Sequence, residues 1–529
     1  MNRRDFIRRT SLASVGGYVL TACNDSMLGP LLSLSPQEDR VLVIVQLYGG
    51  NDGLNTVVPL DQYSLLTQFR SNILLPVNSV LPLQGTNGLT GFHPAMTGLR
   101  SLWDDGKLNI IQGVGYPNPN FSHFRSTDIW ETASNANDVL SSGWIGRYLS
   151  LEYPNYPVGF PNTDMPDPLA IRVGGPVGIG MQNLGVAMGT AINNTSDPLD
   201  LAGNIFLDPA PTNCAGDRLN MIRLVQRQTD QYGDVIEAAA NMNCQQSSLY
   251  PTGSAPGAQL GQALKIVAQL ICGGLKTKVY WVSDTGFDTH AQQTTLLDTT
   301  VGKHADLLQG VSDAIHAFQN DLQGLGLSDR VLGMTFSEFG RRVKSNGSRG
   351  TDHGAAAPMF FFGDHVLPGI VGANPAIDPN TDSETNVDMQ HDFRTVYASV
   401  LKDWFCLPQW AIDDTLLGTY STLPIVDPAG CVAMGLSEDN QTAGVQLLNI
   451  YPSPFQQETA VEFTTLKSGN VRLEMFDAAG SMVQLLVNQT LAPGTYKATA
   501  NLAGMRSGMY SCRLENEGDM QVRNVMKVN

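Results

Sequence analysis

An almost unbroken apolar run early in the chain constrains the fold more than any other feature. Residues 41–47 read Val-Leu-Val-Ile-Val-Gln-Leu, and the turn-forming segment Gly49-Gly-Asn-Asp-Gly53 follows closely. A short, continuous apolar run is typical of a strand that is covered on both faces, as in a parallel sheet between layers of helices. Similar runs recur at residues 108–114, 278–282, 331–336 and 359–362.

A helical pattern separates two of these runs. Its apolar residues recur every three or four positions, which places them on one face of a helix that can pack on the sheet. They are Leu307, Leu308, Val311, Ile315, Phe318 and Leu322. Strands that alternate with such helices predict a doubly wound α/β domain with a mostly parallel sheet over residues 40–431.

The first 39 residues have the pattern of an export signal. The pair Arg3 and Arg4 precedes a mildly apolar run over residues 10–22, which is shorter than the roughly 20 apolar residues that span a bilayer. The segment resembles a twin-arginine signal, and this resemblance implies export by the twin-arginine machinery. The residues before Cys23 also fit a lipobox, so lipidation at Cys23 remains open beside a chance match.

The tail of the chain has a different pattern from the middle. A polar segment, residues 432–444, is followed by short and partly alternating segments with Gly, Asn or Pro between most of them. This pattern predicts a linker and then an antiparallel β-sandwich over residues 445–529. The expected strands are residues 445–450, 460–464, 471–476, 482–487, 495–500 and 509–514.

A series of short motifs marks this tail. In chain order they are Tyr451-Pro-Ser-Pro-Phe455, Phe476-Asp-Ala-Ala-Gly480, Gly494-Thr-Tyr496, Gly508-Met-Tyr510 and Lys527-Val-Asn529. The series resembles the C-terminal sorting domain of the type IX secretion system of Bacteroidota. The resemblance implies the type IX machinery as a partner and delivery through the periplasm to the cell surface or the medium. A generic immunoglobulin-like adhesion module is the alternative.

Charge and cysteine content limit the classes of function. The net charge of −17 argues against nucleic-acid binding and leaves acidic clefts able to hold cations. No two cysteines form a C-x-x-C pair, which argues against a thiolate zinc site. Cys214 with Cys244 and Cys406 with Cys431 could form disulfides in an oxidising compartment, or these residues could be buried thiols.

Polar residues stand next to each expected strand. Because the carboxyl ends of parallel strands meet at one edge of a sheet, these residues are candidates for a common site. Carboxylates and imidazoles together suit a divalent metal ion, and in an extended segment two residues that are two positions apart point to the same side. The metal candidates are Asp52, Asp288, His290, Glu338, Asp352 and His353; the catalytic candidates are Ser122 and Arg125.

The order of these motifs resembles a known bacterial family. The motifs are Gly49-Gly-Asn-Asp52, Ser122-His-Phe-Arg125, Gly286-Phe-Asp-Thr-His290 and Ser337-Glu-Phe-Gly340 leading to Asp352-His-Gly354. In this order they are similar to the family called domain of unknown function 1501. That family is similar in layout to the alkaline phosphatase and sulfatase superfamily. The resemblance implies an alkaline phosphatase-like fold, with Asp52 as a metal ligand, Ser122 as the nucleophile at a helix start, and Asp288 and His290 on one ion.

Two stretches compete for the next superfamily signature, Asp-His-Gly after a strand. The segment around Glu338 directly follows an expected strand, whereas Asp352-His-Gly354 has the required residues. If Glu338 takes the Asp role, Phe339 stands where the superfamily has a ligand histidine, and His353 becomes the final histidine. One of the two metal sites would then be incomplete.

Two functions remain open at this point. The first is a metal-dependent hydrolase of phosphate or sulfate esters, on a small-molecule or glycan substrate. There, cations would lower the pKa of the Ser122 hydroxyl and Arg125 would grip a substrate oxygen. Ser122 could instead simply cap a helix. The second function is a non-enzymatic exported binding protein with a degraded metal site.

Overall fold

The computed structural model describes residues 40–154, 156–195, 219, 231–428, 431, 445–451, 455–477, 481–516 and 519–527. The chain forms two compact units, residues 1–434 and residues 435–529. The predicted export signal with Cys23, the predicted linker 432–444 and Cys214 lie outside the described residues.

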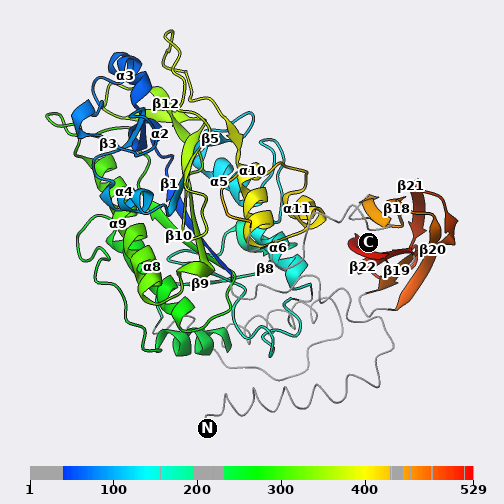
Figure 1. Ribbon diagram of the computed structural model, residues 1–529. Coiled ribbons are helices and arrows are strands. Elements are labelled where there is room, and N and C mark those ends of the chain that lie inside the picture. The colour runs from blue at the N-terminus through cyan, green and yellow to red at the C-terminus, as the bar shows by residue number, and fades with distance from the viewer. Residues whose placement is uncertain are drawn as a thin grey trace. The chain divides into compact units, whose positions relative to one another are not determined.

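A nine-stranded sheet forms the centre of the first unit (Figure 1). Strand β1 (Val41–Tyr48) lies between β10 (Val279–Thr285) and β11 (Val331–Phe336) and is parallel to both, so the carboxyl ends of all three lie at the same edge. The predicted runs 41–47, 108–114, 331–336 and 359–362 all lie in strands of this sheet, and the run 278–282 lies in β10 except for its first residue. In sheet order the strands are β15 (Gly369–Val371), β5 (Leu108–Gly115), β14 (Ala357–Phe362), β11 (Val331–Phe336), β1 (Val41–Tyr48), β10 (Val279–Thr285), β6 (Ala170–Val173) and β9 (Thr190–Ile192), while β16 (His391–Asp392) also pairs with β5.

Strand β14 departs from the parallel arrangement expected for these runs. It is antiparallel to β11 and to β5, with Met334 opposite Phe361 and Met359 opposite Ile111. A buried strand has the same apolar composition in either direction, so the run itself does not encode its direction. Strand β14 follows a hairpin made of β12 (Gly340–Ser345) and β13 (Thr351–Gly354), which brings the chain back along the sheet.

Helices cover both faces of the sheet. On β1, Val43 and Val45 belong to one apolar core and the alternating Leu42 and Ile44 belong to another. The first core includes residues of α4 (Thr97–Asp104), α8 (Ala258–Cys272) and α9 (Lys303–Gly324); the second includes residues of α5 (His123–Thr132), α6 (Trp144–Glu152), α10 (Phe393–Ser399) and α11 (Gln409–Leu416) (Figure 1). Helix α9 contains the helical pattern predicted over residues 307–322. Among the described helices, none is both long and apolar enough to cross a membrane.

The second unit consists of two antiparallel sheets, as predicted for a β-sandwich. One has the order β17 (Val445–Tyr451), β18 (Glu458–Thr465), β21 (Gly494–Asn501); the other has the order β20 (Met482–Leu491), β19 (Gly469–Asp477), β22 (Gly508–Asn516), β23 (Asp519–Lys527). Both sheets contribute to one core, which includes Val461 and Phe463 from β18 and Leu473 and Met475 from β19. The last strand, β23, was not among the predicted strands.

Among the described residues of the first unit, four cysteines form two disulfides. Cys406 bonds to Cys431, as expected for that pair. The expected pair of Cys214 with Cys244 was wrong, because Cys244 bonds to Cys272 at the end of α8. Because Cys272 is the last residue of α8, this disulfide joins the end of the helix to the segment that precedes it.

Candidate metal centre

The loops that follow β1, β10 and β11 are tied together at the carboxyl edge of the sheet. The backbone N–H of Gly49 donates to Glu338 Oε1 at 2.9 Å, and the N–H of Asn51 donates to Ser337 Oγ at 2.9 Å. Gly49 has a φ of +128°, and a Cβ at this position would lie 2.3 Å from the Asp288 backbone nitrogen. A side chain at position 49 is therefore excluded, and glycine allows the two loops to meet.

Three imidazole rings surround the Asp288 carboxylate at this edge, and we call His123, Asp288, His290 and His353 the Asp288 cluster. His290 Nε2 and His353 Nε2 each lie 3.2 Å from Asp288 Oδ1, and the two nitrogens lie 2.9 Å from each other. His123 Nε2 lies 3.6 Å from Asp288 Oδ2. The ligand atoms of His123, Asp288 and His353 all lie within 4.8 Å of one another.

Two of the rings also have an acceptor on the side away from Asp288. His353 Nδ1 is 2.8 Å from the Phe121 carbonyl oxygen, and His290 Nδ1 is 3.1 Å from Asp352 Oδ1. Both partners are acceptors, so each Nδ1 can donate to them, and with the proton on Nδ1 the Nε2 lone pair of each ring would face the cluster. Burial lowers the pKa of His353, which favours its neutral form.

Glu338 is the acceptor behind the third ring, that of His123. Its side chain is fully buried, and Oε1 accepts from His123 Nδ1 at 2.7 Å as well as from the Gly49 backbone. The hydrogen bond to Glu338 raises the pKa of His123 and so makes its Nε2 more basic. Glu338 therefore lies behind a ligand-type nitrogen, and Asp352 is placed in the same way behind His290.

Arg341, a buried residue of β12, supplies a fixed positive charge next to the cluster. It donates to Asp288 Oδ1 at 2.7 Å. Burial alone would raise the pKa of Asp288, but the hydrogen bond and charge of Arg341 outweigh it and lower the pKa to about 2. The other acceptors of the guanidinium are the backbone carbonyls of Gly49, Gly50, Phe287 and Thr351. One arginine thus holds together the segments that form the cluster.

Asp52 lies outside the Asp288 cluster. It is 1% exposed, and both of its carboxylate oxygens accept from Arg70 Nη2 at 2.8 Å, while Gln293 Nε2 donates at 2.6 Å. Burial would raise the pKa of Asp52, but the charge of Arg70 and the hydrogen bonds from Arg70 and Gln293 outweigh it, and the pKa is lowered. His304 is also buried and bonds through Nε2 to Asn51 Oδ1 at 3.0 Å. We call these five residues the Asp52 network.

The catalytic candidates Ser122 and Arg125 lie at the start of α5. Ser122 is the exposed N-cap residue, and its hydroxyl makes no capping hydrogen bond. Both of its neighbours touch the cluster, because Phe121 accepts from His353 and His123 is a member. Arg125 instead donates to the backbone carbonyls of Asn135, Ala136 and Asp138.

His123 is a cluster residue that was not among the candidates selected from the sequence. The available signal was its position directly after Ser122 at the end of the β5 loop, which is the edge where the other candidates gather. Of the cluster, Asp288, His290 and His353 were selected from the sequence, and the structure brings these three together with Asp352 and Glu338 behind the rings.

Comparisons with known proteins give distant likenesses. No curated protein matches the chain. A structure from Bacteroides thetaiotaomicron, associated with the metabolism of multiple glycosaminoglycans, has 10% identity and a TM-score of 0.33, and the match covers 85% of this chain and 89% of that one. A protein in the alkaline phosphatase superfamily from Vibrio parahaemolyticus has 8% identity, coverage of 93% and 84%, and a TM-score of 0.30.

A sulfatase from Pseudoalteromonas sp. is also similar, with 10% identity, coverage of 88% and 85%, and a TM-score of 0.30. Likeness at these TM-scores carries no conclusion about chemistry.

Family models give a clearer result for two parts of the chain. Residues 219–404 match the family described as protein of unknown function (DUF1501), and residues 449–528 match the secretion system C-terminal sorting domain, which confirms both resemblances and indicates export to the cell surface or extracellular space.

Proposed function

We propose that this chain is an exported, metal-dependent hydrolase of phosphate or sulfate esters. The divalent ion would be bound by the Asp288 cluster, that is, by His123, Asp288, His290 and His353. One observation carries the proposal: three rings present Nε2 to one carboxylate while each Nδ1 bonds to an acceptor behind it. The ester class rests on the order of the sequence motifs, and export rests on the sorting domain.

The separations within the cluster fit a bound cation. With their protons on Nδ1, His290 and His353 have two lone pairs facing each other at 2.9 Å, which is repulsive unless a positive charge lies near both. Ligand atoms around a tetrahedral zinc ion, with bonds of about 2.0–2.1 Å, lie roughly 3.3 Å apart. The observed 2.9–3.2 Å among His290, His353 and Asp288 is close to this value. Nitrogen and oxygen donors without a thiolate suit zinc or another divalent transition metal.

Ser122 is our candidate for the nucleophile. When bound, a divalent ion polarises ester oxygens and lowers the pKa of a nearby hydroxyl. The Ser122 hydroxyl is exposed, is not used as a helix cap, and lies between two residues that touch the cluster. Arg125 is held by three carbonyls, so in this conformation it fixes the first turn of α5 and does not face a substrate.

Glu338 and Asp352 would orient ligands and would not bind the ion themselves. Each accepts from the Nδ1 of one histidine, and such partners behind a metal-bound histidine fix its tautomer and ring orientation. Asp52 has no such place in the proposal, because it is buried and both of its oxygens accept from Arg70, with Gln293 as a further donor.

The decisive experiment measures metal content and ester hydrolysis on the full exported chain. We expect near-stoichiometric metal by elemental analysis and turnover of p-nitrophenyl phosphate or p-nitrophenyl sulfate. His290→Ala should lose both, Ser122→Ala should keep the metal and lose turnover, and His316→Ala, on α9 outside the cluster, should keep both. Protein without metal, or a His290→Ala variant that keeps its metal, would refute the assignment of the site.

A second candidate is an exported binding protein without enzymatic activity. It is favoured by the pairing of Asp52 with Arg70, which leaves one cation site where the superfamily resemblance implied two. Stoichiometric metal together with no turnover of either ester would support this candidate over the hydrolase.

A further inference from the structure

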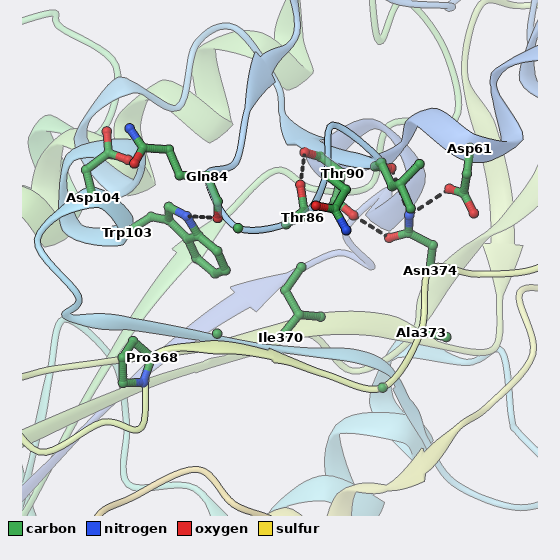
Figure 2. Close-up of a pocket in the computed structure, with 15 residues that line it drawn as sticks. Asp61, Gln84, Thr86, Thr90, Trp103, Asp104, Pro368, Ile370, Ala373 and Asn374 are labelled. Carbon is green, nitrogen blue, oxygen red and sulfur yellow. Dashed lines mark hydrogen bonds between the residues drawn. The ribbon is translucent and has the colours of Figure 1, made fainter.

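A second concavity lies in the same unit and shares no residue with the Asp288 cluster. It has a volume of about 830 Å³, which is in the range of small-ligand sites. Its walls come from the loop between β3 (Leu81–Pro82) and β4 (Thr90–Phe92), from the end of α4, and from residues 368–374. Figure 2 shows Trp103 and Gln84 at one end, Asp61 and Asn374 at the other, and Ile370 between them.

The charge of this pocket excludes anionic ligands. Its lining contains two carboxylates, Asp61 and Asp104, and no lysine, arginine or histidine. Asp104 has a cation partner in Arg100 at 3.0 Å, on the preceding turn of α4, whereas the partners of Asp61 are the neutral side-chain amides of Asn374 and Gln62. A sulfate or phosphate group would meet uncompensated negative charge here. A neutral ligand with hydrogen-bond donors suits these acceptors.

Trp103 provides a fixed flat surface in the pocket. Its indole N–H donates to the Gln84 carbonyl at 3.2 Å, and part of the ring packs against the apolar core beneath α4. Ile370 and Pro368 extend the apolar surface below it (Figure 2). An aromatic ring beside carboxylate and amide groups matches a sugar ring, which has an apolar C–H face and hydroxyl donors around its rim.

The polar end of the pocket is also ordered before any ligand binds. Asn374 Nδ2 donates to Asp61 Oδ1 at 2.6 Å and to the Leu89 carbonyl at 2.8 Å, and Asn374 Oδ1 accepts from Thr90 Oγ1 at 2.9 Å. These bonds fix the orientation of Asn374 and of Asp61. A ligand therefore loses less free energy to the ordering of side chains when it binds.

From these features we propose that this pocket binds a neutral oligosaccharide, with Trp103 stacked on a sugar ring and Asp61 accepting from its hydroxyls. The proposal is independent of the proposed hydrolase, because no residue of the Asp288 cluster takes part. The pocket would hold an uncharged stretch of glycan, in contrast to the anionic ester proposed for the Asp288 cluster.

Affinity electrophoresis of the full chain tests the proposal. Native gels would contain xyloglucan, galactomannan, laminarin or pullulan as neutral probes, and chondroitin sulfate as an anionic probe. We expect retardation by at least one neutral polysaccharide and none by chondroitin sulfate. Trp103→Ala should bind about tenfold more weakly or worse, as for loss of an aromatic anchor. The matched control is Trp410→Ala, which changes a half-buried tryptophan on α11 and should bind like the wild type.

Asp61→Ala serves as a second variant, because Asp61 is exposed and its loss should weaken binding without unfolding the chain. The proposal is overturned if no neutral polysaccharide retards the wild type, or if Trp103→Ala and Asp61→Ala, both folded by their melting curves, bind as well as the wild type. It is also overturned if the pocket binds extended peptides and no glycan, which would point to strand addition at the sheet edge β15.

Discussion

Two carboxylates follow neighbouring strands of the same sheet and have different surroundings. Asp52 comes after β1, is 1% exposed, and is neutralised by Arg70 through both oxygens. Asp288 comes after β10, has a side chain that is 45% exposed, and faces three imidazole nitrogens as well as Arg341, which donates to Oδ1 at 2.7 Å. The comparison teaches that position after a strand predicts the neighbourhood of a carboxylate, whereas its burial and the oxygens left free by its arginine determine its role. Arg70 bonds to both oxygens of the buried Asp52, whereas Arg341 bonds to one oxygen of the half-exposed Asp288 and leaves Oδ2 facing His123.

The largest expected effect concerns Asp52, whose two oxygens both accept from Arg70. Arg70→Met leaves the Asp52 carboxylate buried without a cation and with only Gln293 as a side-chain donor, which should lower the free energy of unfolding by about 3–5 kcal/mol. Asp288→Asn, at a half-exposed site, should cost about 1 kcal/mol or less. Urea denaturation of both variants measures the difference. Equal losses would mean that the two carboxylates are structurally equivalent and would break the comparison.

The next effect concerns Asp288 and its proposed role as a metal ligand. Asp288→Ala removes a proposed ligand and should weaken zinc binding by more than the roughly 10–100-fold that follows loss of a partner behind a ligand. Asp52→Asn should leave zinc affinity near the wild-type value, because Asp52 has no contact with the cluster. Competition titration with a chelating dye measures both constants. A large loss in the Asp52 variant would assign Asp52 to the metal site.

A smaller effect concerns the residue behind a ligand. Asp352→Asn should weaken zinc binding by roughly 10–100-fold, because His290 would lose the carboxylate that fixes its tautomer. Asp382→Asn, at another exposed acidic position, is the control for the change in net charge. If the two variants bind zinc equally well, Asp352 does not act through His290.

The smallest effect is the pH dependence of the Asp52 network. Burial lowers the pKa of His304 from 6.5 to about 4. The unfolded chain therefore binds more protons than the folded chain between these values, so stability is complete above pH 6.5 and is lost as the pH falls toward 4. The slope is about 1.4 kcal/mol per pH unit for one such group. In His304→Gln, urea midpoints at pH 6 and pH 5 should differ less than in the wild type; an unchanged pH dependence would show that His304 is not held neutral.

The sequence predicted the parts of the fold that depend on apolar pattern. The runs that became β1, β5 and β11 are continuous and flanked by polar loops, and both faces of these strands are covered as expected. Direction and pairing were not predictable in this way. The antiparallel direction of β14 and the disulfide between Cys244 and Cys272 depend on which segments, distant in sequence, meet in the fold. No local sequence pattern encodes this.

The sequence predicted several residues of the candidate site, but it did not predict the role of each one. Asp288, His290 and His353 could be selected because two segments placed them at the strand edge. Arg70, which neutralises Asp52, is the residue directly after α3 (Tyr63–Phe69) and belongs to none of the sequence motifs. His123 looked like an ordinary helix residue, because a histidine at a helix start has many structural uses.

The ligand atoms of the Asp288 cluster come from α5, from the loop after β10 and from β13, and so from residues 123 to 353 of the chain. An ion bound there would be a non-covalent cross-link that the unfolded chain cannot form. By mass action, an ion at a hundred times its dissociation constant would add about 2.7 kcal/mol to the free energy of unfolding. The melting temperature of the first unit would then report the free metal concentration around it, and a chelator would act on this protein as a mild denaturant.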